Sequence, residues 1–239
     1  MTFMSTNTET PNYRNLLNLK TWSADQIEDV ISRGADIKAH AGRYSHALQG
    51  RTLALLFQKT STRTRASFEV GMTQMGGHAM YMDWHTTNFA LADLADEARV
   101  LSRYVDGIVA RMLRHVDLCL LAQGSAVPVI NGCCDMYHPC QILGDLQTIR
   151  EYAHQLEGAK LTYIGVHNNV CNSLIEGCTK VGIEITVVAP EKNAPSHDAD
   201  LLHQAQRTGL YKTTLDVRQA VSEADFIYTD TWLDMEYFL

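Results

Sequence analysis

Several features that would place this chain in common functional classes are absent from it. No apolar run approaches 18 residues, so the sequence predicts no membrane-spanning helix. The chain has 20 lysine and arginine residues against 27 acidic residues, so its formal net charge is −7. A globally acidic surface argues against nucleic acid or an anionic membrane as partner. The six cysteines form no CxxC pair and the N-terminus is too polar for a secretory signal, which predicts reduced thiols in a cytoplasmic protein.

The fingerprints of nucleotide and metal sites are missing as well. Neither GxxxxGK[ST] nor GxGxxG occurs, and the loop "IGVHNNV" contributes only Gly165. This argues against a nucleotide-binding Rossmann protein. His138 and Cys140 lie close together but have no further ligand at a metal-binding spacing. We therefore expect no metal and no organic cofactor.

What the sequence does contain is a regular alternation of short apolar segments and amphipathic segments. This pattern is typical of βαβ units and parallel sheets. It predicts an α/β fold with two doubly wound parallel-sheet lobes, residues 1–150 and 151–239, joined by a helix at about 139–154. The second lobe has only three clear strands and no closing helix after the last, so we expect it to be incomplete at its C-terminal end. The expected strands are 51–57, 78–84, 106–112 and 127–133, then 160–166, 183–190 and 224–230.

The segment "FQKTSTRTRASFEVGM" lies where the first of these strands turns into a helix. A helix N-terminus offers free N–H groups and the positive end of the helix dipole. Hydroxyl groups and guanidinium groups in the same place suit phosphate oxygens. We interpret Ser61, Thr62, Arg63 and Thr64 as an anion site, with a well-capped helix start carrying surface arginines as the plainer alternative.

Four further candidates lie at or near strand ends, and each is weak alone. Arg111 ends an apolar strand, His138 and Gln141 flank Pro139 at a helix start, and Asp230 ends the last strand. Asn168 and Asn169 follow another strand, where asparagine is commonly only a helix cap. Together they converge on one edge of the sheets, because ligands of α/β folds bind outside the carboxyl ends of strands. Two ligands facing each other across a cleft indicate group transfer.

In order along the chain, "STRTR", "ARM", "HPCQ", "NN" and "DTW" complete a set of five motifs. With these spacings the chain resembles the aspartate/ornithine carbamoyltransferases, and "HPCQ" and "DTW" are the forms usual in the ornithine branch. The resemblance covers nearly everything from Leu16 to Trp232. It implies a first lobe that binds carbamoyl phosphate, a second that binds the amino acid, and active sites between the subunits of a trimer.

The resemblance also implies roles for individual residues. Ser61, Thr62, Arg63 and Thr64 would hold the phosphate. Arg111, His138 and Thr64 would stabilise the carbonyl oxygen, and Gln141 would bind the carbamoyl amide. The residues implied for ornithine are Asn169, Asp230, Asp234 and Met235. Lys59 and Arg65 are expected to be structural or to face solvent.

Two departures from the family pattern leave alternatives open. Asp234 stands where the ornithine branch usually has serine, and a second carboxylate there would favour a cationic acceptor such as the diamine putrescine. The segment 85–98 lacks the basic or amide residue that usually reaches a neighbouring subunit's phosphate site. A carbamoyltransferase-like binding or regulatory protein without catalysis therefore remains an alternative. The sequence does not decide between biosynthetic and catabolic use.

Overall fold

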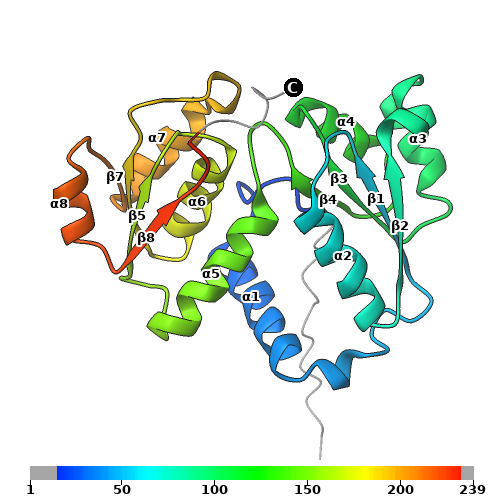
Figure 1. The fold of residues 1–239 in the computed structure, drawn as a ribbon, viewed down its shortest axis with the longest axis horizontal. Coiled ribbons are helices and arrows are strands. Elements are labelled where there is room, and N and C mark those ends of the chain that lie inside the picture. Colours follow the sequence, from blue (N-terminus) through cyan, green and yellow to red (C-terminus); the bar gives the residue numbers. More distant parts are fainter. Residues whose placement is uncertain (1–14, 233–239) are drawn as a thin grey trace, which may run out of the picture.

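The computed structural model describes residues 15–232 and contains two α/β lobes, each built on a parallel sheet (Figure 1). The first sheet has the strand order β2-β1-β3-β4 and the second the order β7-β6-β5-β8. The first lobe contains β1 (Thr52–Phe57), α2 (Thr62–Gln74), β2 (His78–Asp83), α3 (Leu94–Leu101), β3 (Gly107–Arg111), α4 (His115–Gly124) and β4 (Val129–Cys133). The second contains β5 (Lys160–Ile164), α6 (Asn169–Lys180), β6 (Glu184–Val188), α7 (Ala199–Thr208), β7 (Tyr211–Thr213), α8 (Val217–Ser222) and β8 (Phe226–Thr229). This confirms the predicted fold class.

Two helices, α1 (Ala24–Ala39) and α5 (Pro139–Ala153), lie side by side between the sheets. Ser23 caps α1 through a capping box with Gln26, and Pro139 occupies the first turn of α5, where its missing N–H costs nothing. Four short 3₁₀ helices complete the described part of the chain: Ala41–Tyr44, Trp84–Thr86, Asn88–Ala90 and Ala194–Ser196.

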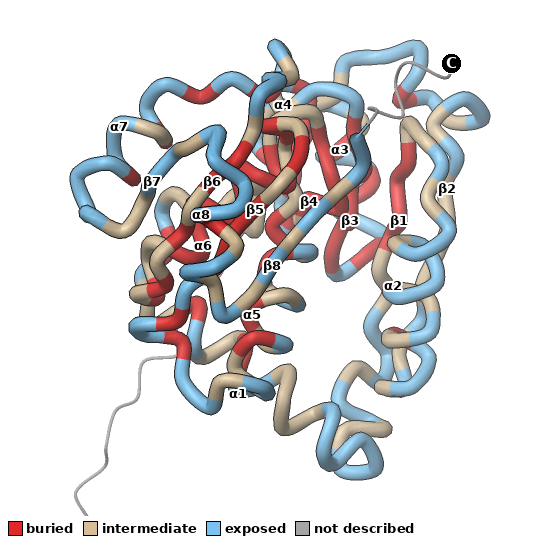
Figure 2. The backbone as a smooth tube through the Cα atoms, turned by 60° about the vertical axis from the view of Figure 1, so that its left-hand side comes forward, coloured by how far each residue is buried: buried red, intermediate tan, exposed pale blue. Residues whose placement is uncertain are grey.

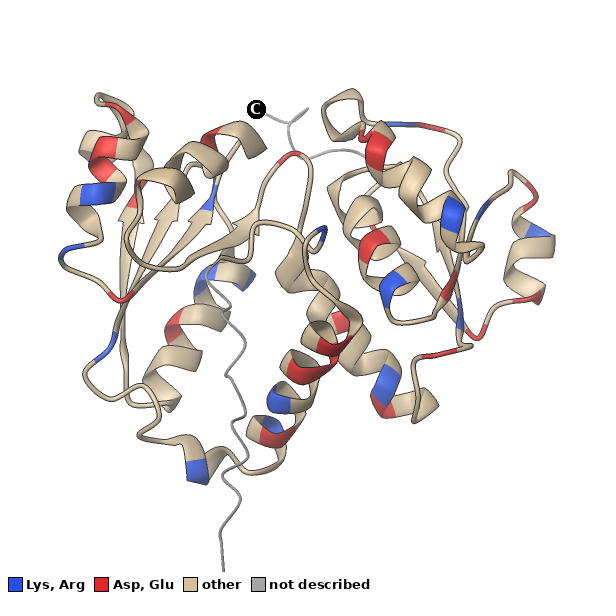
Figure 3. Ribbon diagram, turned by 180° about the vertical axis from the view of Figure 1, so that it is seen from behind, with Lys and Arg blue, Asp and Glu red and all other residues tan. Residues whose placement is uncertain are grey.

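The central strands of the first lobe are closed to solvent on both faces. In β3 every residue is buried, and so are the last four residues of β1 (Figure 2). Parallel strands covered by helices on both faces read as continuous apolar runs, which is why these two were recognisable in the sequence. Charged side chains accordingly lie mainly on helices and loops (Figure 3). Arg111, at the buried end of β3, is an exception that the fold must accommodate.

The core of the second lobe extends across α6 into the connecting helices. Residues 170–178 of α6 are all buried, and α6 packs on α5, which in turn packs on α1. Leu146 and Ile142 of α5 approach Gly177 so closely that an added Cβ there would lie 3.1 Å from Leu146 Cδ1. α5 is therefore attached firmly to the second lobe while its N-terminus faces the first.

One prediction about the second lobe was wrong. Its sheet has four strands rather than three, because β7 pairs in parallel with β6 through Tyr211, Lys212 and Thr213. β7 is only three residues long and two of them are exposed. So short an edge strand carries no alternating pattern that sequence reasoning could detect.

Candidate functional site

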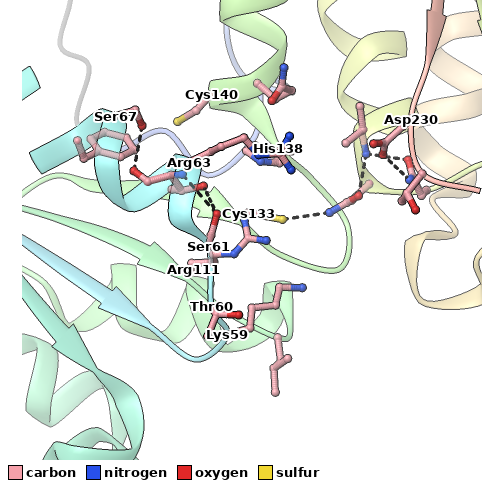
Figure 4. Close-up of a pocket in the computed structure, with 18 of the residues that line it drawn as sticks. Lys59, Thr60, Ser61, Arg63, Ser67, Arg111, Cys133, His138, Cys140 and Asp230 are labelled. Carbon is pink, nitrogen blue, oxygen red and sulfur yellow. Dashed lines mark hydrogen bonds between the residues drawn. The ribbon is translucent and has the colours of Figure 1, made fainter. Parts of the chain in front are cut away.

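A cavity of about 740 Å³ lies where the two lobes face each other. The carboxyl ends of β1, β3 and β4 contribute one wall, and those of β5 and β8 contribute the other. Figure 4 shows the labelled side chains of the first lobe grouped opposite Asp230 of the second. From the first lobe and the start of α5, the cavity is lined by Lys59, Thr60, Ser61, Arg63, Thr64, Ser67, Phe68, Arg111, Leu113, Cys133, His138, Cys140 and Gln141. From the second lobe, it is lined by Asn168, Asn169, Val170, Tyr228, Thr229, Asp230 and Thr231.

The N-terminus of α2 points its first turn at this cavity. Ser61 is the N-cap residue, with extended backbone, and its Oγ accepts a hydrogen bond from Thr64 N at 3.3 Å. The same hydroxyl donates to Thr64 Oγ1 at 2.9 Å, which holds both hydroxyl groups together (Figure 4). The first turn contains no acidic side chain. This part of the cavity is suited to an anion, because the positive end of the helix dipole, the hydroxyl groups and Arg63 lie together there.

Arg111 reaches the cavity through an irregularity in the sheet. The register between β3 and β4 shifts after Ala110, so that Arg111 pairs with Cys133 and Gly132 is the extra residue. Cys133 adopts a positive φ of 146°, which is rare for a residue with a Cβ. Arg111 Nη1 donates to Gly132 O at 3.3 Å, whereas the buried Nε has no partner. A bulge at a sheet edge thus aims a guanidinium into the cavity with hydrogen-bonding capacity left over.

His138 precedes Pro139 and forms the N-cap of α5, although its side chain makes no capping bond. Its backbone N–H donates to Ser173 Oγ at 2.8 Å, which connects the residue to α6. Burial, and after it the positive charges of Arg111, Lys59 and Arg63, lower the pKa of His138 to about 4. The imidazole is therefore neutral at pH 7, and it can donate a hydrogen bond to a carbonyl oxygen without carrying a charge.

The wall formed by the second lobe presents amide and carboxylate groups. Asn168 caps α6 by accepting from Val170 N and Cys171 N, and its Nδ2 donates to Asp230 Oδ2 at 2.9 Å. Asn169 faces the other lobe: its Nδ2 donates to Cys134 O at 2.6 Å and to Cys133 Sγ at 3.3 Å. The carboxylate of Asp230 is thus held by a neutral amide and can accept from a cationic amine.

The structure brings most of the predicted site residues together. Ser61, Arg63, Thr64, Arg111, His138, Gln141, Asn169 and Asp230 all line the cavity. Thr62 does not; it is the exposed first residue of α2. Asp234 and Met235 lie outside the described residues.

The expectation for Lys59 needs correction, whereas Arg65 lies as expected. Lys59 lines the cavity, and its charge contributes to the lowered pKa of His138. Arg65 turns away: its Nε donates to Glu69 Oε1 at 2.9 Å, and its guanidinium lies 3.8 Å from the centre of the Tyr81 ring. Tyr228 and Cys133 are further lining residues that sequence reasoning missed, and nothing in the sequence alone distinguishes them from ordinary residues of strand ends.

Within residues 15–232 no group of three or more histidine, cysteine or acidic side chains is placed to hold a metal ion. None of the helices in that part of the chain is both long enough and apolar enough to cross a membrane.

A cationic site on one lobe that faces an amide and carboxylate site on the other defines a two-lobed α/β protein of the group-transfer class. Comparison with known proteins names the family. Residues 14–151 match the aspartate/ornithine carbamoyltransferase carbamoyl-P binding domain, and residues 157–238 match the Asp/Orn binding domain of the same family. The chain belongs to the aspartate/ornithine carbamoyltransferase family.

Bacterial and archaeal ornithine carbamoyltransferases are among the proteins to which the chain is similar. The chain is 42% identical over 228 residues to an ornithine carbamoyltransferase of Bacillus thuringiensis, a match that covers 94% of this chain and 72% of the relative. It is 41% identical over 230 residues to an ornithine carbamoyltransferase of Thermococcus kodakarensis, covering 93% and 72%. Among solved structures, the ornithine carbamoyltransferase from Pyrococcus furiosus has a TM-score of 0.86 at 40% identity, covering 94% of this chain and 74% of that one.

Proposed function

We propose that this chain transfers the carbamoyl group of carbamoyl phosphate to the δ-amino group of L-ornithine, giving citrulline and phosphate. The observation that carries the proposal is the pairing of two unlike sites around one cavity. The anion site at the start of α2, with Arg111 and the neutral His138, suits an acyl phosphate. Asp230, held by Asn168, suits the cationic end of an amino acid. The relatives named above carry the name of this activity.

In this proposal the first lobe, residues 1–150, binds carbamoyl phosphate, and residues 151–239 bind ornithine. The phosphate oxygens accept from the N–H groups of the first turn of α2, from the hydroxyl groups of Ser61 and Thr64, and from Arg63. Thr62 contributes its backbone to the same turn. The carbonyl oxygen accepts from Arg111 and from the neutral ring of His138, and Gln141 binds the carbamoyl nitrogen.

The chemical step is a nucleophilic displacement at the carbonyl carbon. The neutral δ-nitrogen of ornithine attacks, a C–N bond forms, and the C–O bond to phosphate breaks. The nitrogen gives up one proton, which the departing phosphate takes, and the phosphate leaves with the electron pair of the broken bond. Negative charge develops first on the carbonyl oxygen, beside Arg111, and then on the phosphate, beside Arg63. Fixed donors at both places lower the barrier because they need no reorganisation during the step. Holding both substrates in one cavity contributes the proximity effect.

The family pattern supports a trimer or a multiple of trimers, and the surface of the first lobe fits an interface. Val100 of α3, Tyr104 just after it, and Val116 and Leu120 of α4 are exposed, and α3 packs on α4. Val116 and Leu120 are one turn apart and so lie on one side of α4. An exposed apolar face of this kind marks an interaction site.

We place the reaction in the cytoplasm and in arginine metabolism. All six cysteines are free thiols in the structure, although Cys119 and Cys140 are only partly buried. Free thiols fit a reducing compartment.

The experiment that tests the proposal is an assay of citrulline formation from carbamoyl phosphate, with ornithine and putrescine supplied side by side. Arg111→Ala serves as the variant lacking the carbonyl donor. We expect turnover with ornithine and a loss of 100-fold or more, on the order expected for one oxyanion donor, in the variant. A preference for putrescine would replace the acceptor in the proposal, and no turnover with either amine would support the non-catalytic alternative.

A further inference from the structure

Gln141 is held by a residue one turn further along α5. Its Nε2 donates to Asp145 Oδ1 at 3.0 Å. Gln141 lines the cavity, whereas Asp145 does not line it and is half-buried. The contact therefore joins a side chain of the cavity lining to a carboxyl group outside that lining.

Tyr228 of β8 completes this arrangement from the second lobe. Its hydroxyl interacts with the Asp145 carboxyl and with the Gln141 amide, and the pKa of Tyr228 is raised, chiefly by burial. The ring stacks on Tyr163 of β5 with centroids 6.0 Å apart. A tyrosine that stays neutral can accept from an amide N–H and donate to a carboxyl oxygen at the same time.

A count of donors and acceptors gives the orientation of the Gln141 amide. A carboxamide nitrogen carries two hydrogens, and a carboxamide oxygen carries none. One N–H of Gln141 is bonded to Asp145, and the amide also interacts with the Tyr228 hydroxyl. The nitrogen end of the amide is thus turned toward the protein. The carbonyl oxygen, Oε1, is the group left to meet a ligand in the cavity.

We propose that Asp145 and Tyr228 are positioning residues that hold the Gln141 amide with Oε1 toward the carbamoyl nitrogen. In this way the site selects a carbamoyl group, which has N–H donors, over an acyl group of similar shape that has none. The inference rests on the proposed function, because it takes carbamoyl phosphate as the ligand. Were the amide reversed, its N–H groups would face the N–H groups of the ligand, and neither would be satisfied.

The free-energy cost of Asp145 favours a functional role over a structural one. Its second oxygen, Oδ2, is buried without a hydrogen-bond partner. Burial raises the pKa of Asp145, and the nearby carboxylate of Asp230 raises it further. A carboxyl group so placed destabilises the fold relative to an apolar side chain. Local rules of this kind are broken most often where function requires it.

The test compares the binding of two acyl phosphates by calorimetry, without turnover. Carbamoyl phosphate and acetyl phosphate differ in having an amino group or a methyl group on the carbonyl carbon. The unaltered protein is expected to bind carbamoyl phosphate more tightly, and Asp145→Ala is expected to reduce that preference by roughly 10-fold, the effect of one good hydrogen bond. Tyr228→Phe is expected to reduce it less. Asp145→Asn keeps an oxygen acceptor in place and should restore most of it.

Two further variants separate positioning from general damage. In Gln141→Ala the preference should already be lost, and adding Asp145→Ala should cause no further loss, because Asp145 acts through Gln141. Glu223→Ala breaks a like Gln–Glu contact, Gln219 Nε2 to Glu223 Oε1 at 3.2 Å, on the distant helix α8. It should leave the preference unchanged.

The possible outcomes are distinct. An unchanged preference in Asp145→Ala, or an equal further loss in the Gln141→Ala background, overturns the positioning role while leaving the proposed function intact. If the unaltered protein binds neither acyl phosphate, the proposed function fails, and the inference fails with it.

Discussion

Asn168 Nδ2 donates to Asp230 Oδ2 at 2.9 Å, and this bond joins the start of α6 to the end of β8. The amide cannot reverse, because Asn168 Oδ1 already accepts from Val170 N and Cys171 N as the helix cap. One side chain therefore both begins a helix and orients the carboxylate proposed to bind ornithine. Asn169, to which the family resemblance assigns ornithine, is bonded to the Cys134 carbonyl instead.

Asn168→Ala tests this double role. Loss of the cap should lower the free energy of unfolding by about 1 kcal/mol. Release of Asp230 should raise KM for ornithine several-fold, with the Kd for carbamoyl phosphate unchanged. Asp216→Ala removes a comparable cap from α8, where Asp216 Oδ1 accepts from Gln219 N, and should cost stability alone. If the two variants show the same KM, Asn168 is only a cap.

His138 should make stability depend on pH in a defined window. Its pKa is about 4 in the folded protein, against 6.5 for an unperturbed histidine. Between these values the unfolded state binds a proton that the folded state does not, so stability falls as pH is lowered from 6.5 to 4. The loss should reach about 3 kcal/mol at most. Urea unfolding of His138→Asn should lack this component, while kcat falls by a factor on the order of 100. A parallel pH dependence in both proteins would show that His138 is not buried as described.

Lys59 precedes the N-terminus of α2 in the sequence and Arg65 lies in its first turn, so the effects of the two cations can be compared directly. Only Lys59 lines the cavity, whereas Arg65 stacks on Tyr81. Lys59→Ala should therefore weaken carbamoyl phosphate binding several-fold, with a smaller dependence of Kd on salt concentration. Arg65→Ala should lower the melting temperature and leave Kd unchanged. Equal effects on Kd would mean that net charge, rather than position, governs binding.

Lys59 and Arg65 are close in the sequence but have different surroundings, which the sequence did not predict. Buried strands such as β1 and β3 were predictable because parallel strands read as apolar runs, and their carboxyl ends located the candidate site. Side-chain direction was not predictable, because it depends on where each helix turn begins. The bond between Asn168 and Asp230, and the interaction of Tyr228 with Asp145, join residues that lie far apart in the sequence. No local pattern encodes them.

The exposed apolar face on α3 and α4 should set the oligomeric state. Leu120→Glu places a charge on that face and should shift the protein from the proposed trimer toward monomers, as measured by light scattering after gel filtration. Tyr152→Glu alters an exposed apolar side chain at the end of α5, away from that face, and serves as the control. A Leu120→Glu protein that keeps the mass of the unaltered one would rule out this face as the interface.

Glu176 gives a prediction opposite in sign to that for His138. Its Oε2 accepts from Leu19 N at 3.0 Å, Oε1 has no partner, and burial raises the pKa of the carboxyl to about 7. Between pH 4.5 and 7 the folded state binds a proton that the unfolded state releases, so this group destabilises the protein as pH rises. Glu176→Gln resembles the protonated form. Its free energy of unfolding, relative to the unaltered protein, should increase from pH 5 to pH 8 by about 3 kcal/mol at most.

The measurement is urea unfolding of both proteins across that range, with Glu223→Gln as the exposed control. A constant difference between Glu176→Gln and the unaltered protein would mean that Lys20 and Lys180, whose charges lower the pKa of Glu176, keep the carboxylate ionised throughout. In that case the variant should be the less stable of the two at every pH, because it would lose a buried charge interaction. At pH 8 the variant is the more stable protein if burial dominates and the less stable one if the lysine charges dominate, so the sign of the difference at pH 8 decides between the two effects at this contact between the N-terminal segment and α6.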